Sequence, residues 1–125
     1  MTDSVFVMGD GDDIRKRIEF YLLSGDLEHL QAFSTALTEA IQETARLAVS
    51  TMESKIVLAG GDDILFVTTL SNYREETLRA LMHEFSKRTA CHISFGVGPT
   101  LESAFINLRL AKAQGRGSVV ASGLA

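Results

Sequence analysis

The stretch Leu58–Phe66 (LAGGDDILF) decides how the rest of the chain is interpreted. An apolar run leads into two glycines, two adjacent carboxylates follow, and a second apolar run leaves. Two short apolar runs joined by a Gly-rich connection predict a β-hairpin. Gly60 and Gly61 give the turn backbone freedom and let a bulky ligand approach the main chain. Asp62 and Asp63 repel each other at this tip unless a cation lies there, and the alternative interpretation is a solvated acidic turn.

The composition is that of a globular chain with an acidic surface. The 125 residues are 46% hydrophobic and carry a net charge of −4, which predicts one domain over residues 1–125 and argues against a nucleic-acid or anionic-membrane surface. Cys91 is the one cysteine, so we expect a small buried thiol and no disulfide or Cys-based zinc site. The sequence has neither an apolar run of about 20 residues nor a signal pattern. We therefore expect a cytoplasmic protein that contacts neither membrane nor nucleic acid directly.

Apolar runs and helical periodicity predict the order β-α-α-β-β-α-β-α-β. The expected strands are 4–9, 55–59, 64–70, 91–98 and 118–121. Helices are expected to follow Asp13, Asp26, the segment 71–75 and Thr100. The second and fourth helices are expected to bury apolar stripes at 3.6-residue spacing: Leu27, Leu30, Phe33, Leu37, Ile41, Ala45 and Ala48, and then Leu101, Ala104, Phe105, Leu108 and Ala111.

Polar residues before three of these helices predict how the helices begin. Asp12 or Asp13 is expected to cap the first helix, because a carboxylate accepts the free N–H groups of a first turn. Asn72 with Glu75 fits a capping box for the third helix, and Thr100 fits a cap for the fourth.

The first part of this order, β-α-β-β-α-β, is that of ferredoxin-like α+β folds. We expect an antiparallel sheet of order 4-1-3-2 with the helices packed on one face. In that topology the end of the first strand and the tip of the hairpin share one edge of the sheet. Asp10, Asp12, Asp62 and Asp63 are therefore predicted to converge, although some fifty residues separate the two motifs.

A cluster of carboxylates predicts a site for hard divalent cations, because oxygen ligands favour magnesium, manganese or calcium over zinc. A calcium loop of the EF-hand type counted from Asp10 fails, since Arg15 lies where glycine is needed and Tyr21 where the bidentate glutamate is needed. A two-metal site for phosphoryl transfer is the sharper hypothesis. In it, Gly11 offers an accessible carbonyl, and the helix that starts after Asp13 offers amide donors to phosphate.

Two cations lie around the end of the last expected helix. Lys112 and Arg116 can simply favour a helix C-terminus and solvent. Beside a metal site they become candidates to hold a triphosphate.

Four motifs in order carry a family resemblance: Asp10–Asp12 (DGD), Gly60–Asp63 (GGDD), His92–Val97 (HISFGV) and Ala111–Arg116 (AKAQGR). They resemble the motifs of GGDEF-type palm domains. The GGDD form and the short length are more similar to the minimal CRISPR polymerase family (mCpol), which resembles the cyclase palm of the type III CRISPR polymerase subunit.

The resemblance implies an enzyme that condenses nucleoside triphosphates into a cyclic oligonucleotide, such as a cyclic dinucleotide, for a downstream effector in anti-phage defence. It implies two Mg²⁺ or Mn²⁺ ions and a homodimer whose active sites face each other. Diguanylate cyclases read guanine with an Asn-Asp pair after the first helical turn; this chain has Arg15–Arg17 and Glu19 there, so family analogy favours ATP.

Site residues are carried over by motif. The resemblance implies that Asp10 and Asp62 ligate metal through their side chains and Gly11 through its carbonyl, with Asp63 supporting the site as a metal and catalytic residue. It also implies that Lys112 acts in catalysis and grips phosphate with Arg116. The nucleotide is expected to lie against Gly60, Gly61, Asp12, Asp13 and Ile14.

Three alternatives remain open from the sequence. A ferredoxin-like binding or regulatory module whose acids no longer act is the main one. A sheet-surface RNA binder is disfavoured by the acidic charge and by the lack of an aromatic-rich ribonucleoprotein motif. A mononucleotide cyclase would form an intramolecular bond with the same two metals.

Overall fold

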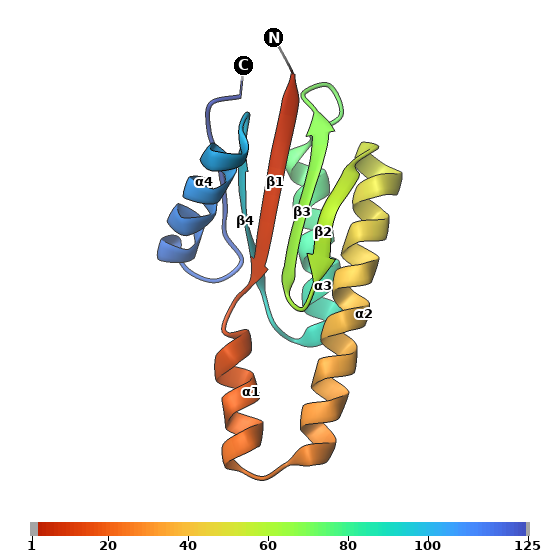
Figure 1. Cartoon of the computed structure of the whole chain (residues 1–125), viewed down its shortest axis with the longest axis vertical. Helices are drawn as coiled ribbons and strands as arrows, with labels where there is room; N and C mark the ends of the chain where they lie inside the picture. Colours follow the sequence, from red (N-terminus) through yellow and green to blue (C-terminus); the bar gives the residue numbers. More distant parts are fainter. Residues whose placement is uncertain (1–2, 125) are drawn as a thin grey trace.

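The computed structural model describes residues 3–124 and has an α+β fold around one five-stranded sheet (Figure 1). The strands are β1 (Ser4–Gly11), β2 (Lys55–Gly60), β3 (Asp63–Thr69), β4 (Ile93–Gly98) and β5 (Val119–Ala121). The helices are α1 (Ile14–Leu23), α2 (Leu27–Met52), α3 (Glu75–Thr89) and α4 (Leu101–Gln114). This element order is the one that the periodicity predicts.

The sheet has the strand order β2-β3-β1-β4-β5. β1 lies between β3 and β4 and is antiparallel to both, and β2 is antiparallel to β3. The predicted ferredoxin-like order 4-1-3-2 is therefore confirmed. β5 extends the sheet beyond β4 and pairs with it in parallel, so the complete sheet is mixed.

Helices cover both faces of the sheet, so the expectation that all of them pack on one face is wrong. Successive strand residues point to opposite faces, and Val7 and Phe95 join α2 and α3 in the main buried core. Gly96 points to the other face, where a Cβ would lie 2.0 Å from the Leu108 nitrogen and 2.2 Å from the Ala104 carbonyl oxygen. α4 therefore lies directly on the backbone of β4, on the face opposite α2 and α3 (Figure 1).

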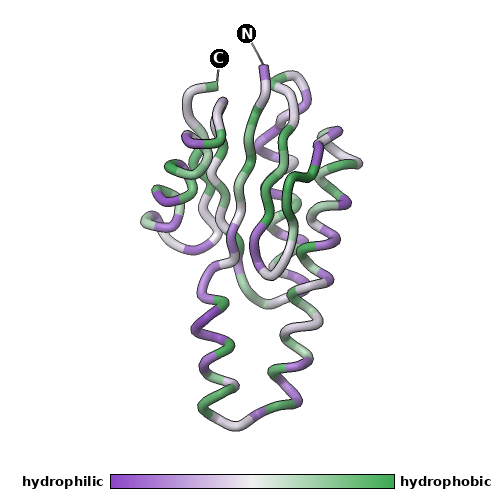
Figure 2. The backbone as a smooth tube through the Cα atoms, in the orientation of Figure 1, coloured by the Kyte–Doolittle hydropathy of each residue, from purple (hydrophilic) through white to green (hydrophobic). Residues whose placement is uncertain are grey.

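Two of the predicted apolar stripes are too wide. Leu101 and Phe105 of α4 are 50% and 48% exposed, whereas Ala104, Leu108 and Ala111 are buried. Because α4 contacts the sheet along a narrow line over Gly96, only one row of its side chains is enclosed. Leu27 is 66% exposed, because α1 and the first turns of α2 extend past the end of the sheet, where polar and apolar residues alternate along both helices (Figure 2).

The helix starts are only partly as predicted. Thr100 caps α4 in a reciprocal capping box with Ser103. The capping box of Asn72 and Glu75 is wrong: α3 begins at Glu75, and Arg74 occupies the N-cap position without a side-chain cap. The Arg74 guanidinium instead donates to the carbonyl oxygens of Ser71 and Tyr73, which closes the preceding turn.

Small differences in strand bounds matter for the site. β1 runs two residues further than predicted and carries Asp10 and Gly11 within its ladder. β4 begins at Ile93, and Cys91 before it is buried, as expected, with burial raising the pKa of its thiol. None of the helices in residues 3–124 combines the length and hydrophobicity that a membrane span requires.

The close approach of α4 to β4 gives a test of the packing. Gly96→Ala should destabilise the fold by about 1–3 kcal/mol or more, because the added methyl meets backbone atoms that cannot rotate away. Thermal unfolding followed by circular dichroism should show a loss of at least about 4 °C in Tm. Gly60→Ala is the matched control: no heavy atom lies within 4 Å of its built Cβ, so Tm should stay nearly unchanged. Equal melting of the two variants would contradict the described contact.

Candidate active site

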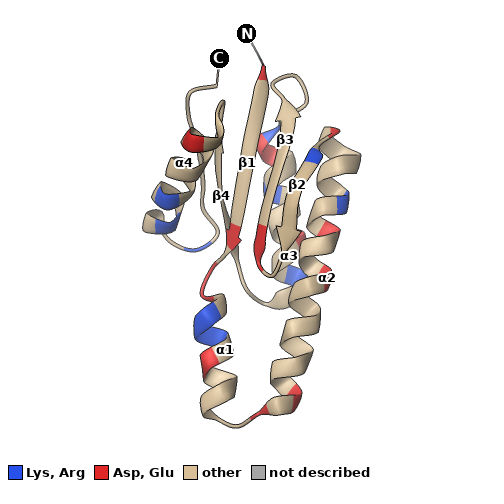
Figure 3. Cartoon of the chain, in the orientation of Figure 1, with Lys and Arg blue, Asp and Glu red and all other residues tan. Residues whose placement is uncertain are grey.

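Backbone pairing brings the two acidic motifs together. In the β1–β3 ladder Asp10 is the partner of Asp63, and the Gly11 N–H donates to the Asp62 carbonyl oxygen at 3.0 Å. Carboxylate oxygens of Asp10, Asp62 and Asp63 all lie within 4.8 Å of one another. Figure 3 shows acidic residues at the end of β1 and the start of β3, side by side. The predicted convergence of four acids is confirmed for these three aspartates, called the acidic triad below. It is wrong for Asp12, which is not part of this cluster and bonds to Ser94, Lys112 and Gly117 instead.

Glycines leave open space around the triad. Gly61 has a φ of +58°, which favours glycine in the two-residue turn between β2 and β3. A Cβ built at Gly60 or Gly61 meets no heavy atom within 4 Å, so the outer side of the turn is accessible. Gly11 is enclosed instead: a Cβ there would lie 2.6 Å from Ile14 Cγ1 and 3.1 Å from Asp62 Cβ.

The triad is electrostatically unbalanced. A hydrogen bond with Asp10, burial and the charges of Asp10 and Asp62 raise the pKa of Asp63 to about 7. Burial and then the charge of Asp10 raise the pKa of Asp62. Burial also acts to raise the pKa of Asp10, but hydrogen bonds with Asp63 and Lys112 outweigh it and lower the pKa below its ordinary value. Asp10 is therefore the carboxylate that stays charged most easily, at the expense of its neighbours.

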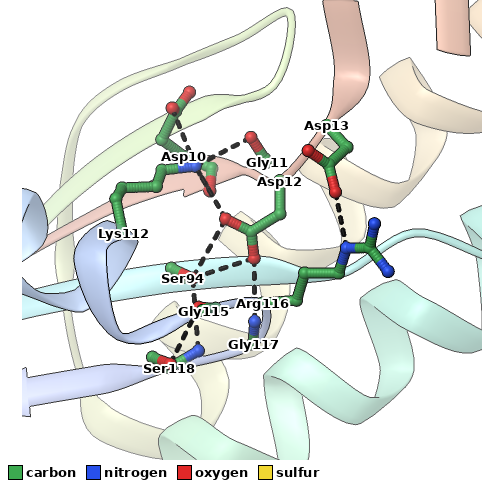
Figure 4. A network of polar contacts seen from close by, with 10 residues as sticks. All are labelled: Asp10, Gly11, Asp12, Asp13, Ser94, Lys112, Gly115, Arg116, Gly117 and Ser118. Atoms are coloured by element: carbon green, nitrogen blue, oxygen red, sulfur yellow. Dashed lines mark hydrogen bonds and ion pairs between the residues drawn. The ribbon is translucent and has the colours of Figure 1, made fainter. Parts of the chain in front are cut away.

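Lys112 reaches from the last turn of α4 into this corner (Figure 4). Its ammonium Nζ lies 3.0 Å from Asp10 Oδ2 and 2.8 Å from Asp12 Oδ1. It also donates to the backbone carbonyl oxygens of Asp10 and Gly11, both at 2.9 Å. Although burial opposes it, hydrogen bonding to Asp12 and Asp10 raises the pKa of Lys112 above its ordinary value, so the side chain is a cation at neutral pH.

Asp12 is a buried carboxylate, with 8% of the residue exposed. It accepts hydrogen bonds from Ser94 Oγ at 3.0 and 2.8 Å, from the Gly117 N–H at 2.8 Å and from Lys112. Asp12 thus ties β1 to β4 and to the turn before β5. Sequence reasoning did not single out Ser94, although a serine within an otherwise apolar strand was a usable signal.

Asp13 and Arg116 form an exposed ion pair, in which Arg116 lowers the pKa of Asp13. Asp13 occupies the N-cap position of α1 with a left-handed φ of +60° but makes no side-chain cap hydrogen bond. The predicted capping by Asp12 or Asp13 is therefore wrong, because both carboxylates have partners elsewhere. In the described chain no side chain caps the first turn of α1.

A cavity of about 820 Å³ opens beside the triad, between α1 and α4. Asp10, Gly11, Asp62 and Lys112 contribute one wall, and α1 contributes another with Ile14, Arg15, Ile18, Glu19 and Leu22. Arg109 of α4 also lines it. Sequence reasoning missed Arg109, which lies one helical turn before Lys112 and was detectable from that spacing.

An apolar cavity of about 320 Å³ adjoins the same acids on the α4 face of the sheet. Met8, Leu58, Leu65 and Phe105 contribute to its walls next to Asp10, Asp63 and Lys112. The triad therefore lies at the junction of a polar and an apolar hollow.

The donor set fits a hard divalent ion. The triad offers carboxylate oxygens, and Gly11 adds a backbone carbonyl at the same corner. Oxygen ligands of this kind select Mg²⁺ or Mn²⁺. The hydrogen bond with Asp10 and burial raise the pKa of Asp63 most, and the negative charges of Asp10 and Asp62 add to the rise, so a bound cation would stabilise the charged forms of the acids.

The family model of the minimal CRISPR polymerase domain (mCpol) matches residues 6–122. The chain belongs to the mCpol family. A comparison with curated proteins finds no match.

Solved structures of Csm1 and of GGDEF domains share the fold of this mCpol chain. The Csm1–Csm4 cassette in complex with cA4 aligns with a TM-score of 0.75 at 19% identity, over 95% of this chain and 21% of that chain. The GGDEF domain of DgcB from Caulobacter crescentus, in complex with c-di-GMP, gives 0.64 at 17% identity, over 96% and 78%. The active GGEEF domain of a diguanylate cyclase from Vibrio cholerae gives 0.58 at 16%, over 94% and 81%. The mCpol chain thus has a nucleotide cyclase-like palm fold and spans about a fifth of the Csm1 chain.

The unbalanced triad predicts a pH dependence of stability. The pKa of Asp63 in the folded chain, about 7, lies above the ordinary value of 3.8. Between these values the folded chain holds a proton that the unfolded chain has released, so the contribution of Asp63 becomes less favourable as pH rises. In EDTA, Asp63→Asn should therefore melt at a higher temperature than the wild type at pH 8 and at nearly the same temperature at pH 4.

The control for this measurement is Glu39→Gln, which neutralises an exposed carboxylate of α2. It should shift Tm equally, and slightly, at both pH values. A Tm of Asp63→Asn below that of the wild type at pH 8, or a difference independent of pH, would contradict the described repulsion.

Proposed function

We propose that this mCpol chain is a nucleotidyltransferase that condenses nucleoside triphosphates, with ATP favoured, into a cyclic oligonucleotide. We further propose that this product, such as a cyclic dinucleotide, is a signal for an effector in anti-phage defence. The observation that carries the proposal is the acidic triad with Lys112 at its side, next to a cavity large enough for a nucleotide.

The proposed reaction is attack of a ribose hydroxyl on an α-phosphate, with pyrophosphate as the leaving group. Asp10 and Asp62 would hold two Mg²⁺ or Mn²⁺ ions with the Gly11 carbonyl, and Asp63 would support them. These ions would supply neutralisation of charge on the attacking and leaving oxygens.

The remaining site residues would bind and orient the triphosphate. Lys112 and Arg116 offer cationic donors, and the first-turn amides of α1, from Ile14 onward, offer N–H groups toward phosphate. Gly60 and Gly61 leave room for the nucleotide above the turn. Asp12 holds Lys112, and Asp13 holds Arg116, in position for this role.

The choice of ATP draws on the neighbouring structures. The Csm1–Csm4 cassettes that share this fold are complexes with cA4, cA3 and pppApApA. Their ligands support adenine as the base in the proposed reaction, as does the lack of the Asn-Asp pair with which diguanylate cyclases read guanine.

We also propose that the active form is a homodimer with the two sites facing each other. Leu58 and Phe105 are about half exposed beside the acids, and a second copy would cover them. Sedimentation with ATP and Mg²⁺ should give a dimer, and a persistent monomer would contradict this part of the proposal.

The catalytic assignment has a direct test. The purified chain is incubated with each of the four nucleoside triphosphates and Mg²⁺ or Mn²⁺, and products are identified by mass spectrometry. The wild type should form a cyclic adenylate. Asp62→Ala should lose at least about 99% of the product, because loss of a metal ligand costs at least as much as the roughly 10–100-fold loss that follows removal of a hydrogen-bond partner of a ligand.

Glu39→Gln is the activity control and should retain product formation, and circular dichroism should show that Asp62→Ala is folded. A fully active Asp62→Ala would contradict the catalytic assignment. Calorimetry with Mg²⁺ and ATP that gives no metal-dependent heat would instead favour a regulatory module.

A further inference from the structure

We propose that the Lys112 ammonium is a resident counter-cation that competes with a divalent ion for the Gly11 carbonyl and for Asp10. Metal binding then requires the ammonium to move away from these oxygens while it remains on Asp12. This inference rests on the proposed function, because it concerns the same metal site.

The contacts of Lys112 are those of a cation in an oxygen cage. Its Nζ lies within 3.0 Å of four oxygen atoms: Asp10 Oδ2, the Asp10 and Gly11 carbonyl oxygens, and Asp12 Oδ1. An ammonium has three N–H donors, so with four oxygen atoms this close at least one N–H is shared between two of them. A phosphate-gripping lysine aimed only at solvent would not make these contacts.

Two of the four oxygens are the ones that the donor set assigns to a metal. The Gly11 carbonyl has little freedom to turn away, because it shares a planar peptide group with the Asp12 N–H, which donates to the His92 carbonyl oxygen at 2.8 Å, and because Gly11 is buried against Ile14. A divalent ion on this carbonyl and on Asp10 would therefore meet the ammonium at close range. The two positive charges repel each other, and the singly charged group on the flexible stem is the one that can move.

Asp12 provides the pivot for this movement. Ser94 Oγ and the Gly117 N–H hold its carboxylate independently of Lys112. The Lys112 side chain is 28% exposed and lines the 820 Å³ cavity. Nζ can therefore turn into the cavity, toward the position of a triphosphate, without giving up Asp12 Oδ1.

Arg109 makes a matched control possible. It carries the same charge, lies on the same helix and lines the same two cavities as Lys112, and its guanidinium lies over the Phe105 ring at 6.0 Å. Removing either residue lowers the positive field near the triad by one charge. Only Lys112 contacts the Gly11 carbonyl among the hydrogen bonds seen in residues 3–124.

The experiment measures Mn²⁺ binding to the full chain without nucleotide, by titration followed with electron paramagnetic resonance. Lys112→Met should bind Mn²⁺ at least about tenfold more tightly than the wild type, and Arg109→Met should stay within about threefold. Lys112→Gln is a second variant with the same expectation, in case Lys112→Met does not fold. Equal gains in Mn²⁺ affinity for Lys112→Met and Arg109→Met would show that only the loss of one positive charge near the triad matters. Weaker Mn²⁺ binding by Lys112→Met would show that the ammonium does not compete with the metal. Either result overturns the inference.

Asp62→Asn separates this failure from that of the proposed function. Mn²⁺ binding that depends on Asp62 but not on loss of Lys112 would overturn the counter-cation role and leave the proposed metal site standing. Absence of Mn²⁺ binding in the wild type and in every variant would overturn both.

Discussion

The register of the β1–β3 ladder is the constraint on which the site depends. It pairs Asp10 with Asp63, and the bond from the Gly11 N–H to the Asp62 carbonyl extends the contact by one step. Because the side-chain period of a strand is two, a slip of one residue would turn Asp10 to the opposite face. Val7 of the same strand is fully buried in the core, so the same slip would turn its side chain out of the core. Packing of the core and assembly of the acids are thus one requirement.

The acids gathered by this register are costly for the folded chain, and Lys112 offsets part of that cost. Lys112 forms ion pairs with Asp10 and Asp12, and Asp12 also accepts hydrogen bonds from Ser94 Oγ and the Gly117 N–H. The end of α4 and the turn before β5 are therefore fastened to the end of β1 by one buried carboxylate. An arrangement in which like charges are held together at a strand end is typical of a functional site and is unfavourable in a purely structural one.

Much of this architecture was predictable, for identifiable reasons. Strand and helix periodicities are local, and the β-α-β-β-α-β order then limits the sheet to a topology that brings Asp10 and Asp62 together. The face of the sheet that α4 covers was not predictable in the same way. The sequence shows a glycine at position 96, but only the structure reveals that the backbone of α4 packs against it. The partners of some side chains were not predictable either. In the sequence the carboxylates of Asp12 and Asp13 fit a helix cap, but in the structure they bind residues that lie far away in the sequence.

We propose that Asp10 at the end of β1 and Asp62 in the turn between β2 and β3 hold divalent ions against a triphosphate. A crystal structure with Mn²⁺ and a non-hydrolysable α,β-methylene analogue of ATP tests it most directly, because the anomalous signal locates the ions. We expect manganese peaks within coordination distance of carboxylate oxygens of both Asp10 and Asp62, beside the phosphates of the analogue. Nucleotide bound with no manganese at these two residues, or manganese bound elsewhere on the chain, would contradict it.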